Sequence, residues 1–220
     1  RKSKKILIYF FLIIVISSIN NLSLHNLKFN NINDIKISGL SKKENEILFQ
    51  KIKKMNLENI FFINSNEISN LIESNSLIEH YEVKKIYPST IYVKIQKTNF
   101  YAKININDET FLIGSNGKLS PNHFQNNDLP FIFGKPNIKE FLYFKNIIDQ
   151  SKFSYDQIEN LYFYPSKRWD LKLKNNILLK LSEKPTIEYL DDLYQFLKQD
   201  NIEKFTIVDA RLKNQIILNE

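Results

Sequence analysis

The first pattern along the chain is a run of apolar residues near its N-terminal end. No formal charge occurs between Lys5 and Lys28, so residues 6–27 form an uncharged stretch of 27 − 6 + 1 = 22 residues. As a helix, such a stretch is roughly 33 Å long, and the hydrocarbon core of a bilayer is about 30 Å thick. Residues 6–16 are all aliphatic or aromatic. The pattern predicts a transmembrane anchor at residues 6–27.

The residues in front of this stretch predict its orientation. Residues 1–5 (RKSKK) carry four cations, and Lys and Arg favour the cytoplasmic side of a membrane. We therefore expect a cytoplasmic basic end at residues 1–5 and an exported remainder. A cleavable signal peptide also starts with basic and apolar residues, but no A-x-A-like site follows here. A core helix of a soluble protein would carry a polar stripe, which residues 6–16 lack.

Residues 32–97 show a strand, two helices and two further strands. Ser41-x-x-Glu44 and Asn64-x-x-Glu67 are capping-box patterns, in which each side chain accepts a hydrogen bond from a free amide at a helix start. The apolar residues that follow have helical spacing, and Ile91, Val93 and Ile95 alternate with polar residues. The predicted elements are a strand at 34–39, helices after Ser41 (Ile47, Leu48, Ile52, Met55) and after Asn64 (Ile68, Leu71, Ile72), and a hairpin of 78–87 with 90–97.

The second half of the chain is rich in strand patterns. Trp169, Leu171 and Leu173 alternate with polar residues and predict a strand with one buried face. The predicted strands are 101–106, 109–113, 129–134, 155–164, 169–173, 177–181, 205–208 and 212–218. Two helices are predicted, one from about Asn137 to Gln150 (Ile138, Phe141, Leu142 and Ile148 inward) and one from Pro185 (Leu190, Leu193, Phe196 and Leu197 inward). Two helices packed on one large antiparallel sheet is the simplest arrangement for this order.

Composition and motifs limit the kinds of binding site that we expect in this chain. The formal charge is +7, of which residues 1–5 supply four units, so the remainder is near 7 − 4 = +3 and no strongly basic nucleic-acid surface is expected. The chain has no Cys and only three His, without metal-ligand spacing. Gly114-x-x-Gly117 lacks the Lys-Ser/Thr of a phosphate loop, and no nucleophile elbow occurs. We therefore expect no metal site and no phosphate-binding loop, and no motif points to a nucleophile.

Two arginines and the last strand are candidates for partner contacts. Outside residues 1–5, Arg occurs only at Arg168 and Arg211, and Arg offers a bidentate geometry that Lys cannot. An internal salt bridge, for instance from Arg211 to Asp209, is the alternative. The apolar strand near the C-terminal end, residues 214–218, offers free backbone groups if it lies at a sheet edge. The alternative is a central strand that closes the sheet internally.

Several short motifs follow one another along the chain. They are Ile35-x-Ile37-x-Gly39, Ile86-Tyr-Pro88-Ser-Thr-Ile91-x-Val93-x-Ile95, Phe111-Leu-Ile-x-x-x-Gly117, Leu129-Pro130 with Gly134, Arg168-Trp169-x-Leu171-x-Leu173 before Asn175-Asn176-Ile177, and Val208-Asp209-x-Arg211-Leu212. In order and spacing, these motifs resemble those of the FtsQ/DivIB family of bacterial cell-division proteins. Departures lie at residues 97–102, where only Ala102 matches the family motif, and at Gly114 and Ala210, where the family often has Asp and Leu.

The resemblance implies an α+β architecture behind the single N-terminal transmembrane helix. It implies a small β-α-α-β-β POTRA domain at residues 28–99, and then a mixed β-rich domain at residues 100–220 that ends in a partner-binding edge strand. It further implies location in the bacterial inner membrane, enriched at the division septum. The N-terminus would be cytoplasmic and the C-terminal domains periplasmic.

The function implied by the resemblance is that of a non-enzymatic scaffold of the divisome, without cofactors. It would link early and late division proteins by binding the small coiled-coil proteins FtsB and FtsL, one of which adds a strand to the terminal edge. Alternatives are an anchored POTRA-type export or envelope-assembly factor and a membrane-anchored periplasmic cell-wall hydrolase. By position, the implied partner-binding residues are Arg168, Arg211, Leu212, Asn214, Ile216 and Leu218.

Overall fold

Helix α1 (Lys2–Ile19) contains the most apolar part of the chain. The computed structural model describes residues 2–19, 32, 34–55, 57, 60, 65–122, 128–199, 202–212 and 215–219. Residues 20–27 of the predicted anchor and Arg1 of the basic end lie outside these ranges. Among the described residues, no helix combines the length and the apolar character needed to cross a membrane. The anchor remains a prediction.

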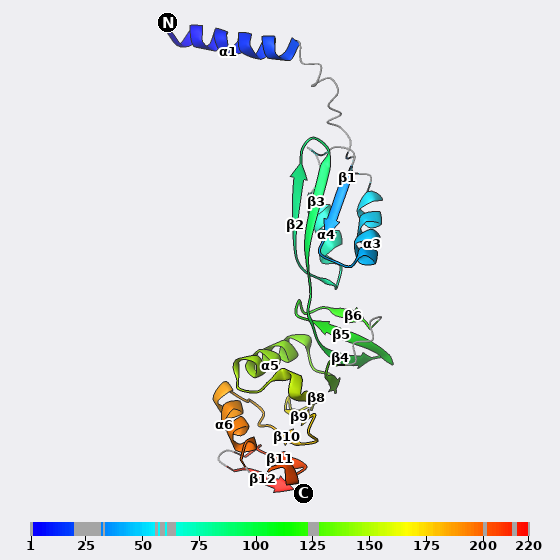
Figure 1. The fold of residues 1–220 in the computed structure, drawn as a ribbon, viewed down its shortest axis with the longest axis vertical. Coiled ribbons are helices and arrows are strands. Elements are labelled where there is room, and N and C mark those ends of the chain that lie inside the picture. The colour runs from blue at the N-terminus through cyan, green and yellow to red at the C-terminus, as the bar shows by residue number, and fades with distance from the viewer. Residues whose placement is uncertain are drawn as a thin grey trace. The chain divides into compact units, whose positions relative to one another are not determined.

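The chain divides into two compact units, residues 1–74 with 80–96 and residues 75–79 with 97–220. In the first unit, the predicted β-α-α-β-β order is confirmed (Figure 1). The described strands form a sheet of order β1-β3-β2, with β1 parallel to β3. The elements are β1 (Asp34–Ser38), α3 (Lys42–Lys53), α4 (Ser65–Glu73), β2 (Ile78–Ile86) and β3 (Thr90–Lys97).

The capping box predicted for α3 is present. The Ser41 hydroxyl accepts a hydrogen bond from the Glu44 amide (3.3 Å), and the Glu44 carboxylate accepts one from the Ser41 amide (2.9 Å). Asn64, the predicted cap of α4, lies outside the described residues. Leu48 and Ile52 of α3 are buried, whereas Ile47, which we expected to face inward, is 50% exposed. The reason is that Ile47 lies about 100° around the helix from Leu48, on its solvent side.

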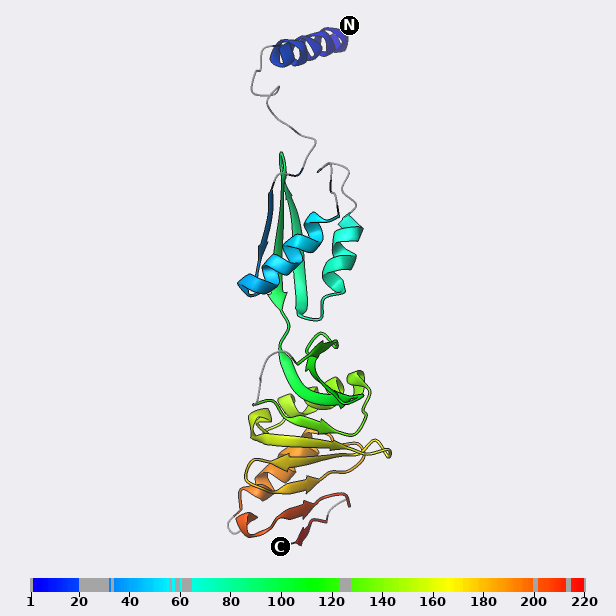
Figure 2. The same ribbon diagram turned by 90° about the vertical axis from the view of Figure 1, so that its right-hand side faces the viewer.

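Figure 2 shows α3 and α4 side by side on one face of the three strands. They cover the alternating residues Ile91, Val93 and Ile95 of β3, which are buried as predicted. Gly39 ends β1 with a φ of +114°, and a Cβ placed there would lie 1.8 Å from the Ile95 carbonyl oxygen. Only glycine allows the backbone to pass β3 so closely.

The second unit contains a nine-stranded sheet in the described part of the chain, in the order β12-β11-β10-β9-β8-β7-β4-β5-β6. Its strands are β4 (Phe100–Ile106), β5 (Glu109–Gly114), β6 (Leu119–Pro121), β7 (Phe131–Phe133), β8 (Ile158–Phe163), β9 (Trp169–Leu173), β10 (Leu178–Lys180), β11 (Ile207–Asp209) and β12 (Ile217–Asn219). Its helices are α5 (Ile138–Gln150), α6 (Ile187–Leu197) and the short 3-10 helices η1 (Tyr155–Gln157) and η2 (Ile202–Lys204).

The prediction of an antiparallel sheet is wrong in part, because the sheet is mixed. The pairs β4/β7, β7/β8 and β10/β11 are parallel. Helix α5 connects β7 to β8, and α6 connects β10 to β11. Such a helical crossover returns the chain in the same direction, so the two connected strands become parallel neighbours.

Two further boundaries differ from the prediction. Helix α6 does not start at Pro185 but at Ile187, because the Thr186 hydroxyl accepts a hydrogen bond from the Tyr189 amide (3.2 Å) and acts as the N-cap. The last strand is shorter than residues 212–218 and begins only at Ile217. Leu212 and Ile216 therefore precede β12.

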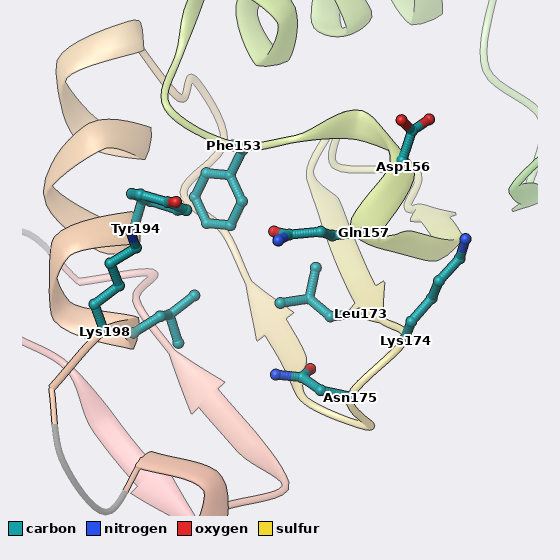
Figure 3. Close-up of a pocket in the computed structure, with 9 residues that line it drawn as sticks. Phe153, Asp156, Gln157, Leu173, Lys174, Asn175, Tyr194 and Lys198 are labelled. Atoms are coloured by element: carbon teal, nitrogen blue, oxygen red, sulfur yellow. The ribbon is translucent and has the colours of Figure 1, made fainter.

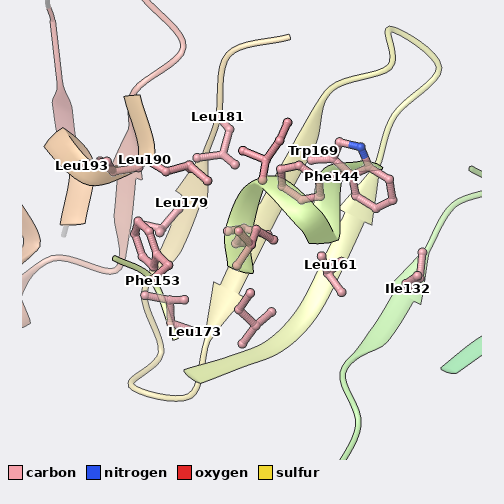
Figure 4. Packing of buried hydrophobic residues seen from close by; sticks show 14 of the residues in the cluster. Ile132, Phe144, Phe153, Leu161, Trp169, Leu173, Leu179, Leu181, Leu190 and Leu193 are labelled. Atoms are coloured by element: carbon pink, nitrogen blue, oxygen red, sulfur yellow. The ribbon is translucent and has the colours of Figure 1, made fainter. Parts of the chain in front are cut away.

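Helices α5 and α6 pack on one face of this sheet around a single apolar core (Figure 4). A row of paired residues runs under them across six strands, from Ile132 through Leu161, Leu171, Leu179 and Val208 to Leu218. The ring of Phe144 in α5 stacks on Trp169 at 5.0 Å. Full burial of an aliphatic side chain contributes about 1.5–3 kcal/mol, so this row fixes the register of the strands at the C-terminal end.

Candidate partner-binding site

Strand β12 lies at one end of the nine-stranded sheet and pairs antiparallel with β11. Of the two alternatives considered from the sequence, an edge strand and a central strand, the described part of the chain shows the edge strand. No strand among the described residues pairs with its other side. The backbone groups on that side are then available to an added strand.

The side chains next to this edge divide between the two faces of the sheet. Leu218 pairs with Val208 and packs against the core beneath the helices. Ile217, the residue before Leu218, points to the opposite face and is 55% exposed. We call the face opposite α5 and α6 the open face. Of the predicted contact residues, Leu218 thus holds β12 in place rather than facing solvent, and Asn214 lies outside the described residues.

Charged residues form a line on the open face, which we call the charged row: Arg168, Asp170, Lys180, Asp209 and Arg211. Lys180 of β10 is in register with Asp170 of β9 on one side and with Asp209 of β11 on the other. Each aspartate is also bound by an arginine two residues away. With three cations and two anions, the charged row has a net charge of 3 − 2 = +1.

The pair Arg168–Asp170 is the buried end of the charged row. Arg168 donates from Nε and Nη2 to the two carboxylate oxygens of Asp170, at 3.1 and 3.4 Å. Asp170 is fully buried and also accepts a hydrogen bond from the Leu181 amide at 3.3 Å. The guanidinium lies 4.3 Å from the Tyr164 ring centroid. Burial and the Asp170 charge raise the pKa of Tyr164.

The pair Asp209–Arg211 is the exposed end. Arg211 donates from Nε and Nη2 to Asp209 at 2.8 and 2.6 Å, and these bonds lower the pKa of the Asp209 carboxyl. The internal salt bridge considered as an alternative is therefore present. Since the Arg211 side chain is 45% exposed, it keeps donors in reach of solvent and of a partner.

A groove of about 410 Å³ lies on the other face, between α6 and residues that precede β12. We call it the α6 groove. The Tyr189 hydroxyl donates to the Ala210 carbonyl (2.6 Å) and accepts from the Ser182 amide (3.2 Å), so one wall is fixed. Burial raises the pKa of Tyr189. The residues that line the α6 groove are Tyr189, Asp192, Leu193, Ala210, Leu212, Gln215 and Ile216.

The α6 groove brings together two predicted contact residues, Leu212 and Ile216, which are 56% and 37% exposed. Arg168 and Arg211 lie on the open face instead. Sequence reasoning missed Tyr189 and Asp192. They flank the predicted apolar residues Leu190 and Leu193 of α6, so the helical period places them beside the buried stripe. The residues between β11 and β12 that lie opposite them in the groove could not be inferred from that period.

A second hollow of about 330 Å³ lies at the C-terminal end of α6 (Figure 3). Phe153 and Tyr194 form its aromatic wall, with their ring centroids 5.4 Å apart, and the Lys198 ammonium lies 4.7 Å from the Tyr194 centroid. Its lining contains no Ser, Cys or His among the described residues. In the described part of the chain, no three His, Cys, Asp or Glu side chains form a group that could hold a metal ion.

Two protein-family models match the chain. The model "POTRA domain, FtsQ-type" matches residues 30–97, and the model "Cell division protein FtsQ/DivIB, C-terminal" matches residues 102–211.

The relatives found carry the name "Cell division protein FtsQ". The protein of Rickettsia conorii is 26% identical over 179 residues, which cover 73% of this chain and 61% of that protein. The protein of Rickettsia bellii is 25% identical over 202 residues, covering 84% and 70%. That of Rhizobium meliloti is 23% identical over 194 residues, covering 84% and 61%. The chain thus spans about three fifths to seven tenths of the length of these relatives.

Among solved structures, one similar chain is the major extracytoplasmic domain of the trans isomer of the bacterial cell-division protein DivIB from Geobacillus stearothermophilus. It is 13% identical in sequence with a TM-score of 0.34, and the match covers 45% of this chain and 87% of that one.

Proposed function

This chain belongs to the FtsQ/DivIB family of bacterial cell-division proteins, and from this premise we propose that it is a non-enzymatic scaffold of the divisome. It links early and late division proteins by capturing an FtsB- or FtsL-type partner. The capture takes place at β12, where the partner adds one strand to the sheet.

The observation that carries this proposal is the edge position of β12 next to the charged row. Strand addition supplies backbone hydrogen bonds, and alternate side chains supply specificity. Arginine donors give charge-assisted bonds to partner carboxylates, which are stronger than neutral ones and fix the register. The net positive charge of the charged row favours acidic side chains on the partner.

Each candidate residue has a role in this proposal. Arg211 and Arg168 contact partner acids on the open face, with Arg211 the more accessible of the two. Leu212 and Ile216 contact apolar partner side chains at the α6 groove. Leu218 acts indirectly, because it packs β12 onto the core. Asn214 is proposed as a contact from the sequence resemblance alone.

We propose the predicted organisation of the chain as part of this function. Residues 1–5 are the cytoplasmic end, 6–27 the membrane anchor, 28–99 the POTRA domain and 100–220 the periplasmic partner-binding domain. Outward-facing apolar side chains along α1, such as Ile6, Phe10 and Ile13, support an anchor. The protein would then sit in the inner membrane and gather at the septum.

Depletion of the protein in its native host tests the proposal. We expect smooth filaments with segregated nucleoids and no completed septa. Cells of normal length that leak envelope contents or show wall defects would contradict the scaffold function. Such a result would favour the two alternatives, an export or envelope-assembly factor or a cell-wall hydrolase. No contact among the described residues favours either alternative.

A further inference from the structure

We infer that the segment added to β12 places a lysine or arginine in the α6 groove, against Asp192, while its neighbouring residues carry acids toward the charged row. This inference rests on the proposed function and specifies the chemistry of the partner. It commits to one occupant, an extended partner segment with acidic side chains on one face and an apolar-basic face on the other.

The first step is the opposite charge of the two faces next to the edge. On the open face, Lys180 and Arg211 contribute to the net charge of +1 of the charged row. On the helix side, Asp192 is the only charged residue among the described residues that line the α6 groove. The same edge thus offers a positive surface on one side and a negative group on the other.

The second step is the state of Asp192. It is exposed, and among the described residues no ion pair or hydrogen bond of its side chain occurs. The preceding residue, Asp191, is different, because its carboxylate accepts a hydrogen bond from the Lys152 amide at 2.6 Å. Asp191 is therefore used within the fold, and Asp192 is free to receive a cation.

The third step is the shape of the lining. Leu193, Leu212 and Ile216 give the α6 groove an apolar wall beside the carboxylate of Asp192. A lysine or arginine side chain matches this lining, because its hydrocarbon stem can cover the apolar wall and its cationic head can pair with the carboxylate. The stem would cover Leu212 and Ile216, and the head would reach Asp192.

The fourth step is the geometry of a strand. Successive side chains of a strand point to opposite faces. In the added strand, the residue that enters the α6 groove and the residues on the same face as Lys180 and Arg211 are therefore an odd number of positions apart. A slip by one residue would exchange the faces and bring like charges together. The two faces thus also select one register.

A charge exchange with the full-length chain tests this inference. The chain is held in detergent micelles, and the probe is the purified full-length FtsB/FtsL-type pair of the native host. We expect Asp192→Asn to weaken binding about threefold to tenfold, and Asp192→Lys to weaken it further. Asp191→Asn is the matched control and should leave the affinity within about twofold, because an amide oxygen still accepts the Lys152 amide.

The partner cation is then identified by rescue. Each extracytoplasmic Lys and Arg of the probe is changed to Glu and tested against Asp192→Lys. Recovery of binding by one such change supports the inference and identifies the residue. Unchanged binding of Asp192→Lys, or loss that no change restores, overturns the inference alone. A wild-type chain that does not bind the probe overturns the proposed function as well. Cooperative thermal unfolding of each variant checks that it is folded.

Discussion

Asp170 and Asp209 lie on opposite sides of Lys180, each directly in register with it across β9, β10 and β11. Each aspartate also holds an arginine from its own strand end. The two predicted arginine contacts are thereby brought onto one face of the sheet, Arg211 at the end of β11 next to the edge strand and Arg168 at the start of β9. This placement depends on the parallel pairing of β10 with β11, which α6 makes possible.

The buried end of the charged row should contribute much more to stability than the exposed end. Arg168→Ala leaves the fully buried Asp170 carboxylate without its cation. Breaking a buried pair in this way costs about 3–5 kcal/mol. Arg211→Ala removes a more exposed pair and should cost far less. Urea unfolding of the full-length chain in detergent compares the two variants. Equal losses would contradict the assigned burial.

The stability contribution of Asp209 should depend on pH in the acidic range. Because hydrogen bonds from Arg211 lower its pKa in the folded chain below the ordinary value of 3.8, its contribution is fully present above that value. It is lost as the pH falls through the lower folded pKa. The difference in unfolding midpoint between the wild type and Asp209→Asn should therefore shrink on acidification from pH 6 to pH 2. A constant difference would show that the Arg211 bonds do not act in solution.

Two substitutions beside the same edge should have different outcomes. Ile216→Lys places a cation at the exposed α6 groove, so partner capture should be abolished while unfolding stays cooperative. Leu218→Lys places a cation against the core, so the C-terminal part of the sheet should lose its cooperative unfolding. Pull-down of the partner pair and thermal unfolding separate the two effects. If Ile216→Lys unfolds, Ile216 belongs to the core and the groove assignment is wrong.

Charge reversal on the open face should weaken partner binding without harming the fold. Arg211→Glu removes a donor and puts a second carboxylate beside Asp209, so an acidic partner group would be repelled. The affinity for the partner pair should fall, with most of the change removed at high salt because exposed charges are screened. An unchanged affinity would assign Arg211 to its internal bridge alone.

A glycine pair tests how closely the backbone is packed. Gly134 has a φ of +103°, and a Cβ there would lie 2.2 Å from the Phe163 carbonyl oxygen. Gly117 has a φ of +73°, but its nearest neighbour, the Leu142 Cδ1 atom, is 3.6 Å away. Gly117→Ala should cost about 1–2 kcal/mol, the expense of left-handed backbone alone. Gly134→Ala should cost clearly more, and denaturant titration decides the order.

Features set by neighbouring residues could be predicted from the sequence. The capping box of Ser41 and Glu44 depends on four residues and is present. The alternation of Trp169, Leu171 and Leu173 depends on the period of a strand, and all three are buried. The order of elements in the first unit follows from such local patterns.

Features set by distant segments could not be predicted in this way. Asp170 alternates with Trp169 on the polar side of the predicted strand, but it is fully buried and accepts hydrogen bonds from the Arg168 guanidinium and the Leu181 amide. The parallel pairing of β10 with β11 depends on where α6 returns the chain. The α6 groove requires Asp192 and Leu212 to meet although they are 20 positions apart.

The central claim is that a division partner adds a strand to β12. Amide hydrogen exchange of the full-length chain in detergent, alone and with the host's FtsB/FtsL-type pair, tests it most directly. We predict that exchange at Ile217, Leu218 and Asn219 slows by about tenfold or more in the complex. The outward amide of Leu218 becomes hydrogen-bonded to the added strand, and the pairing of Ile217 and Asn219 with β11 opens less often. A complex that forms while exchange at these three residues stays unchanged would contradict strand addition at this edge.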